Sequence, residues 1–185
     1  MRYTLIEAET VYDGSQLSSL WAYRNCALQG DSIVAFTGPC KVSLDKMVDM
    51  ADVLAGDFIY SEKMLHFIVE HFDLDLEKTV TRQRLLMAVI SETIMEAAGV
   101  PVTRKGDDLF LDTCKLSVSI ATLSPVSTLI HTGLNLSSRN TPVPTVSLPE
   151  IGVHETPAFA NRVMEKYTTE IAGIRMARCK VRGVG

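Results

Sequence analysis

Paired cysteines, membrane-spanning runs and a secretion signal are all missing from this sequence. Its four cysteines are widely scattered and include no Cys-x-x-Cys pair, so their spacing predicts neither a disulfide framework nor a zinc ribbon. No apolar run approaches the roughly 20 residues that cross a bilayer. The N-terminus shows no basic segment followed by an apolar one. We therefore expect a soluble, cytoplasmic protein with no membrane partner.

Basic charge is also scarce. The chain has 18 Lys and Arg residues against 22 Asp and Glu residues, which gives a net charge of −4. A nucleic-acid binder needs a Lys/Arg footprint to neutralise phosphates, and the basic cluster here is terminal, at Arg175, Arg178, Lys180 and Arg182. Short charge runs of this kind are usually solvated. Nucleic acid is therefore not an expected partner. The sequence also contains no P-loop, no Gly-x-Gly-x-x-Gly motif and no internal repeat.

Apolar residues are plentiful enough for one core. The 185 residues are 46% hydrophobic and 22% charged, values typical of a globular protein that folds without disulfide or metal. We expect a single domain over residues 1–185. An exposed edge strand of its sheet would allow two copies of the chain to pair as a homodimer.

Two early segments predict β-strands. Tyr3 and Leu5 indicate an opening strand. Residues 32–42 (SIVAFTGPCKV) carry apolar residues on both faces, which is typical of a central strand, and Gly38-Pro39 is predicted to halt it.

Residues 64–72 (MLHFIVEHF) fit either a helix or a strand. As a helix that starts after Ser61, the segment would align Glu62, His66 and Glu70 at a spacing that can coordinate a divalent ion. Its aromatic and β-branched content favours a strand. A strand is therefore the favoured interpretation, the helix stays open as the alternative, and no metal ligand is assigned.

Three segments predict helices: residues 17–30 with Gly30 at the end, residues 81–98 before Gly99, and residues 156–172 with Thr156 as N-cap and Gly173 as the stop. Hairpin-linked strands with helices packed on one face make an α+β fold with an antiparallel or mixed sheet.

The segment from Lys115 to Leu136 predicts a two-strand hairpin with a turn at Ser124-Pro125. Because side chains alternate along a strand, each strand should have two unlike faces. The face predicted to pack on helices carries Leu116, Val118, Ile120, Val126, Ile130, Leu134 and Leu136. The opposite face, which would meet a ligand, carries Lys115, Ser117, Ser119, His131, Gly133 and Asn135.

The string GDDLFLDTCKLSVSIAT, followed by a turn and LIHTGLNLS, resembles the core of biotin protein ligases and lipoate-protein ligases. Those enzymes share their fold with the catalytic domain of class II aminoacyl-tRNA synthetases. DGSQL, GDSIVAFTGPC, MLHFIVEHFD, RQRLL and KLSVSI together resemble a largely archaeal family of unknown function in the same superfamily, and this likeness covers nearly the whole chain. It implies a ligase-like fold.

The resemblance also implies roles for individual residues. Lys115 matches the ligase lysine that holds the carboxylate and the α-phosphate of an acyl-adenylate, which makes it the candidate catalytic residue. Asp108 matches the aspartate of the ligases' Asn-Asp pair, and Asp107 stands where their asparagine would be. Asn135 matches the asparagine of the returning Gly-x-Asn strand.

Three further residues are candidates for ligand binding. Ser117 and His131 share the predicted face with Lys115, and Arg24 is a candidate to contact an adenylate from elsewhere in the chain. Val118 stands in place of the ligases' glycine, and their Gly/Arg-rich adenylate loop has no good counterpart here.

Two classes of function follow. The resemblance implies a ligase or acyltransferase-like enzyme that activates or transfers a small carboxylic acid, with ATP as co-substrate. The alternative is a non-catalytic module on the same fold that binds a small molecule or another protein.

Overall fold

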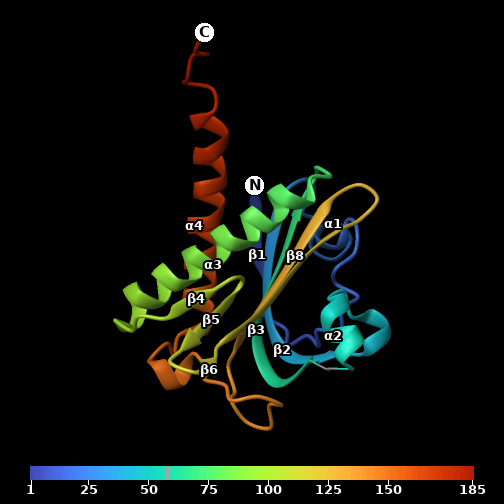
Figure 1. Cartoon of the computed structure of the whole chain (residues 1–185), viewed down its shortest axis with the longest axis vertical. Coiled ribbons are helices and arrows are strands. Elements are labelled where there is room, and N and C mark those ends of the chain that lie inside the picture. The colour runs from blue at the N-terminus through green and yellow to red at the C-terminus, as the bar shows by residue number, and fades with distance from the viewer. Residues whose placement is uncertain (57–58) are drawn as a thin grey trace.

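The computed structural model describes residues 1–56 and 59–185. Within them, a mixed sheet forms the centre of the molecule (Figure 1). Its strands, in spatial order, are β1 (Arg2–Leu5), β2 (Ser32–Val42), β3 (Ile59–His71), β8 (Thr128–Asn135) and β7 (Ser117–Leu123). β1 pairs with β2 in parallel, and the other neighbours are antiparallel. A smaller sheet contains β4 (Thr103–Lys105), β5 (Asp108–Leu111) and β6 (Cys114–Lys115).

Two long helices, α3 (Leu76–Ala98) and α4 (Thr156–Ala177), cover one face of the large sheet (Figure 1). Their buried side chains meet the inward residues of the strands in one apolar core, which includes Phe67, Met87, Ile90, Ile130 and Tyr167. The sheet and these helices confirm the predicted α+β fold, although the prediction of helices on one face holds only for the two long ones. None of the described helices has the length and apolar content to cross a membrane.

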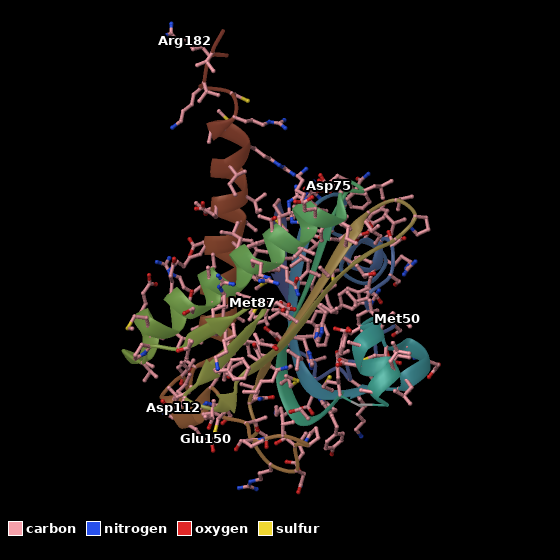
Figure 2. The ribbon with its side chains drawn as sticks, viewed as in Figure 1. Met50, Asp75, Met87, Asp112, Glu150 and Arg182 are labelled. Atoms are coloured by element: carbon pink, nitrogen blue, oxygen red, sulfur yellow. The ribbon has the colours of Figure 1, made fainter. Side chains whose placement is uncertain are left out.

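The opposite face of the sheet carries a second, smaller apolar cluster and two short helices, α1 (Trp21–Cys26) and α2 (Met50–Ala55). Met50 on α2 and Met87 on α3 lie on opposite sides of the sheet (Figure 2). The cluster is built from Tyr12, Phe36, Cys40, Val42, Met64 and Ile68. This face is the one that holds the candidate site.

Tyr12 reaches that face because its backbone runs along the edge of β2. Thr10 N–H donates to Thr37 O and Tyr12 N–H donates to Pro39 O, each at 2.9 Å. A Cβ on Gly38 would lie 2.0 Å from the carbonyl oxygen of Thr10. Only glycine lets the two backbones approach this closely.

The strand prediction for residues 64–72 is confirmed, since β3 runs from Ile59 to His71. In an extended strand, Glu62, His66 and Glu70 are each separated by about 13 Å at roughly 3.3 Å per residue. The helical spacing that would have brought them to one ion does not arise. Glu70 instead accepts hydrogen bonds from the Leu20 backbone at 2.8 Å and the Ser127 hydroxyl at 2.7 Å.

Several predicted ends of elements were wrong. The helix predicted over residues 17–30 is only Trp21–Cys26, because Leu20 and Ala27 both adopt left-handed backbone conformations at its two ends. β2 continues through Gly38-Pro39 with a register shift instead of halting there.

The long helices also differ from their predicted bounds. α3 begins at Leu76, where the Asp75 side chain accepts a hydrogen bond from Lys78 N–H. Glu155, not Thr156, precedes the first turn of α4, and the helix passes Gly173 to reach Ala177. A glycine inside a helix costs only about 1 kcal/mol, which the packing of the preceding turns offsets.

Candidate functional site

The chain changes sheets at Leu116, and this break decides which side chains reach the site. Lys115 ends β6 of the small sheet and Ser117 begins β7 of the large one. Leu116 N–H donates to Leu109 O, and Asn135 N–H donates to Leu116 O. Leu116 therefore packs in the helix-side core, whereas Val118 packs against the cluster on the opposite face.

The prediction that Leu116, Val118 and Ile120 share a face was therefore wrong. Regular alternation was assumed to begin at Lys115, but it begins only at Ser117. As a result Val118 and Ile120 line a cavity together with Lys115. The hydroxyl of Ser119 instead meets helix α3, where it accepts a hydrogen bond from Gln83 Nε2 at 2.9 Å.

The alternation predicted for the partner strand is confirmed within β8. Ile130 and Leu134 lie in the helix-side core, while His131 and Asn135 line cavities on the other face. Gly133 sits between them, where a Cβ would come within 2.9 Å of the Met64 side chain. Val126 was assigned to the apolar face but is exposed beyond the strand end.

Two adjoining cavities occupy this face of the sheet. The first, here called the loop-side cavity, has a volume of about 270 Å³. It is lined mainly by Tyr60, Met64, Ser117, Asn135 and the loop residues Thr141, Pro142, Val143 and Thr145. The second, the histidine-side cavity, has about 230 Å³ and includes Tyr12, Lys46, Asp107, Asp108 and His131. Asp52, Ile59, Lys115 and Val118 line both, so Lys115 stands at their junction.

Lys115 forms an ion pair with Asp108, with 2.8 Å between Nζ and Oδ2. Both side chains are mostly buried, with exposed fractions of 30% and 24%. Burial raises the pKa of the Asp108 carboxyl, Lys115 opposes that rise, and the charges of Asp107 and Asp52 add to it, so the net pKa is raised. Asp108 Oδ1 is buried without a hydrogen-bond partner in the described part of the chain.

Asn135 holds the backbone around Lys115. Its side-chain amide donates to Lys115 O at 3.1 Å and to Val146 O at 3.3 Å. These bonds tie the end of β6 to the loop that closes the loop-side cavity. Two backbone hydrogen bonds add to this link, from Lys115 N–H to Pro144 O at 2.9 Å and from Val146 N–H to Lys115 O at 3.1 Å. Asn135 thus supports the position of Lys115 as well as lining the cavity.

The remaining candidates divide. Ser117 lines the loop-side cavity, and its hydroxyl accepts a hydrogen bond from Leu109 N–H at 2.8 Å. Arg24 lies on α1, bonds to the Ser18 hydroxyl at 2.9 Å and lines neither cavity. The structure therefore brings together Lys115, Asp108, Ser117, His131 and Asn135, and leaves Arg24 apart.

Two buried histidines, His66 and His131, form a pair beneath the site, and His131 lines the histidine-side cavity. His66 Nδ1 lies 3.0 Å from His131 Nε2, and His66 Nε2 lies 3.1 Å from Gly38 O. The ring of Tyr12 stacks on His131 with centroids 3.6 Å apart and planes 9° from parallel. Burial lowers the pKa of His66 to about 4 and that of His131 well below its ordinary value, so both rings are neutral near pH 7.

Sequence reasoning missed Tyr12 and gave His66 no role once the helix was set aside. The alternation of β3 does place His66 on the same face as Ile68. Tyr12 carries no comparable signal, because its position depends on the close approach of the Thr10 backbone to Gly38, which lies far away in the sequence.

Residues 1–182 match the family model described as Domain of unknown function (DUF366). The chain belongs to this family. It is 36% identical over 166 residues to the "Uncharacterized protein MJ0805" of Methanocaldococcus jannaschii, covering 86% of this chain and 75% of that protein. A solved "Protein of Unknown Function" from Pyrococcus horikoshi shares 37% identity, with a TM-score of 0.91 over 99% of this chain and 100% of the other.

Biotin and lipoate ligase structures share the fold of this DUF366 protein. The biotin protein ligase from Aquifex aeolicus, in complex with biotin and ATP, gives a TM-score of 0.59 at 16% identity over 90% of this chain and 69% of the ligase. A T. acidophilum protein with bound lipoic acid gives 0.61 at 12% identity, over 93% and 86% of the two chains. The predicted ligase-like fold is confirmed.

Proposed function

We propose that this protein binds a small carboxylic acid with its carboxylate at Lys115, and activates or transfers the acyl group. The proposal rests on the position of the Lys115 ammonium, which is mostly buried at the junction of two cavities. A half-desolvated cation attracts an anion more strongly than an exposed lysine does. The fold relatives support this choice, since they include ligases solved with biotin, ATP or lipoic acid.

The loop-side cavity suits the hydrocarbon part of such an acid. Ile59, Met64, Val118 and Val143 supply apolar surface, while Ser117 and Asn135 supply a few polar groups. Small-molecule sites commonly combine an apolar lining with a few placed polar groups and start near 300 Å³. The cavity of about 270 Å³ therefore fits a short acyl chain that leads away from Lys115.

Lys115 would also serve activation. Attack of a carboxylate on ATP brings two anions together, and a fixed ammonium neutralises the charge that develops on the phosphoryl oxygens. Asp108 would orient the ammonium through the 2.8 Å ion pair. In this role Lys115 is the preorganised donor, and Asp108 holds it in position.

One observation favours binding without activation as the second candidate. Asp52, Asp107 and Asp108 all line the histidine-side cavity, and carboxylates repel the phosphates of ATP. Arg24, the arginine expected to contact an adenylate, lines neither cavity. A protein with this charge pattern can hold an acid without reacting it with ATP.

Acid-dependent exchange of labelled pyrophosphate into ATP separates the two candidates. Octanoate, lipoate, biotin and amino acids would each be tested with ATP and Mg²⁺. We expect exchange with at least one acid, and a loss of at least about a hundredfold for Lys115→Met, the scale reported for removing one charge-stabilising donor. Lys63→Met, which removes an exposed lysine paired with Glu9, is the matched control. Binding of an acid without exchange would leave the second candidate standing.

A further inference from the structure

The hydrogen-bonding roles of the two buried histidines are fixed by the backbone carbonyl of Gly38. A carbonyl only accepts, so His66 Nε2, at 3.1 Å from it, carries the hydrogen. In a neutral ring the other nitrogen is then bare, and His66 Nδ1 accepts from His131 Nε2 at 3.0 Å. His131 Nε2 therefore carries the hydrogen, and His131 Nδ1 keeps a free lone pair.

The position of that lone pair is fixed as well. The His131 ring is only 3% exposed, and Tyr12 packs flat against it. The bond to His66 prevents the ring from flipping without loss of a buried hydrogen bond. Nδ1 has no hydrogen-bond partner among the described residues, although His131 lines the histidine-side cavity. The histidine-side cavity is thus lined by a ring whose acceptor nitrogen is held in one orientation.

Carboxylates outnumber ammonium groups in the histidine-side cavity, which is lined by Asp49, Asp52, Asp107 and Asp108 and by Lys46 and Lys115. Asp107 and Asp108 line the same cavity, and Asp108 Oδ1 is buried without a partner in the described part of the chain. A ligand that presented only acceptors here would leave Asp108 Oδ1 and His131 Nδ1 without a donor. An N–H group is the complementary chemistry.

We propose that His131 Nδ1 recognises an N–H donor on the ligand, so that the protein selects a carboxylic acid bearing a urea, amide or amine group over a plain aliphatic acid. This proposal rests on the proposed function only in taking the ligand to be an acid held at Lys115. The hydrogen bond to Gly38 O fixes which nitrogen of His66 carries the hydrogen, and the bond to His66 then fixes the same for His131. Tyr12 keeps the acceptor in place by stacking.

Small probes without a carboxylate test the donor site separately from Lys115. 2-Imidazolidinone carries two N–H groups on a cyclic urea, and 1,3-dimethyl-2-imidazolidinone is the same ring without them. Ethylammonium distinguishes a cationic N–H donor from a neutral one. Titration of each, followed by the ¹⁵N resonances of labelled histidine, reports on His131 Nδ1 directly.

In the unliganded protein we expect the Nδ1 resonance of His131 at the position of an unprotonated imidazole nitrogen. At least one N–H probe should move it toward the protonated range and bind at least about tenfold more tightly than the dimethylated ring, in line with one net hydrogen bond and one avoided unpaired acceptor. A protonated Nδ1 in the free protein overturns the proposal. Equal binding of the methylated and unmethylated rings overturns it too.

Two substitutions complete the test. His131→Phe keeps a flat ring under Tyr12 but removes the acceptor, and should abolish the preference for N–H probes. His131→Gln, whose amide can donate to His66 and present an oxygen, should restore part of that preference. Lys115→Met should leave the probes unaffected while weakening carboxylic acids. If Lys115→Met instead leaves acid binding unchanged, the proposed function fails and the His131 result still stands on its own.

Discussion

At the scale of single residues, the site is a balance of charges around Lys115. The cavity that Lys115 lines also contains the carboxylates of Asp49, Asp52, Asp107 and Asp108 and the ammonium of Lys46. The direct partner of Lys115, Asp108, has a raised pKa because burial and the neighbouring negative charges outweigh the ion pair. The ion pair therefore makes a charged Asp108 tolerable. It also leaves Lys115 oriented toward the cavities, where an incoming carboxylate would meet it.

Replacing Lys115 should change the free energy of unfolding and its dependence on pH. Lys115→Met leaves the mostly buried Asp108 unpaired, and we expect a loss of about 1–3 kcal/mol in the free energy of unfolding at pH 7. Asp108 then has a folded pKa above its unfolded one, so lowering the pH protonates it and recovers stability in the variant. Urea unfolding across pH measures both effects.

The double variant Lys115→Met/Asp108→Asn is the control for that loss. Asparagine carries no charge, so the double variant should be more stable than the single one at pH 7, and its stability should lack the recovery at low pH. If Lys115→Met costs nothing, or if the double variant is no better, the ion pair does not hold Asp108 in the way described.

At the scale of elements, the edge of β2 is the support on which the histidine-side cavity depends. Gly38 allows the Thr10–Tyr12 segment to run against β2, and this segment delivers Tyr12 to its stack on His131. The same carbonyl of Gly38 sets the orientation of His66. One glycine thus serves both the backbone approach and the order of the histidine pair.

Gly38→Ala should push the Thr10–Tyr12 segment away from β2. The new Cβ would meet the Thr10 carbonyl at 2.0 Å, and we expect a loss of about 1–3 kcal/mol, the usual cost of overpacking. Gly173→Ala is the matched control, since nothing lies within 4 Å of its Cβ position and it is inside α4; it should gain roughly 0.5–1 kcal/mol from helix propensity. Equal unfolding free energies for the two variants would contradict the tight approach at Gly38.

Some of these elements could be predicted from the sequence and others could not. Alternation in residues 128–135 and the apolar run of residues 32–42 identified central strands, because burial of a whole face leaves a strong periodic signal. The break at Leu116 left none, since it depends on hydrogen bonds to Leu109 and Asn135 that are remote in sequence. The ends of α1 and α4 were missed because left-handed residues other than glycine, and a glycine within a helix, contradict the usual end signals.

The candidate site followed the same division. Lys115, Asp108 and Asn135 were found through resemblance to ligase motifs, and the structure does gather them. Arg24 was not brought to them, because α1 is short and directs it to Ser18. Tyr12 and the link between His66 and His131 arise from tertiary packing alone, which no local pattern in the sequence encodes.

At the scale of the whole molecule, the buried histidines tie stability to pH. The pKa of His66 is lowered to about 4 by burial, below the value of roughly 6.5 in an unfolded chain. Between these values the unfolded state binds more protons, so the free energy of unfolding should fall as the pH drops from about 6.5 toward 4. The expected slope is about 1.4 kcal/mol per pH unit from His66 alone.

Chemical unfolding at a series of pH values measures this slope. His66→Gln should make the slope shallower by the share of His66, while His131 still contributes. His154→Gln, at an exposed histidine, should leave the slope unchanged. A wild-type stability that is constant between pH 6.5 and 4.5 would show that the histidines are not held neutral by burial.

The central claim is that Lys115 holds the carboxylate of a small acid in the cleft shared by the two cavities. Calorimetric titration of wild type, Lys115→Met and Lys63→Met with octanoate, lipoate and biotin tests it most directly. We expect at least one acid to bind wild type and the Lys63 variant alike. It should bind Lys115→Met at least about tenfold more weakly, because the substitution removes a hydrogen-bonded charge contact of roughly 1.5–3 kcal/mol. Equal affinity for wild type and Lys115→Met, or no binding of any of these acids, would contradict it.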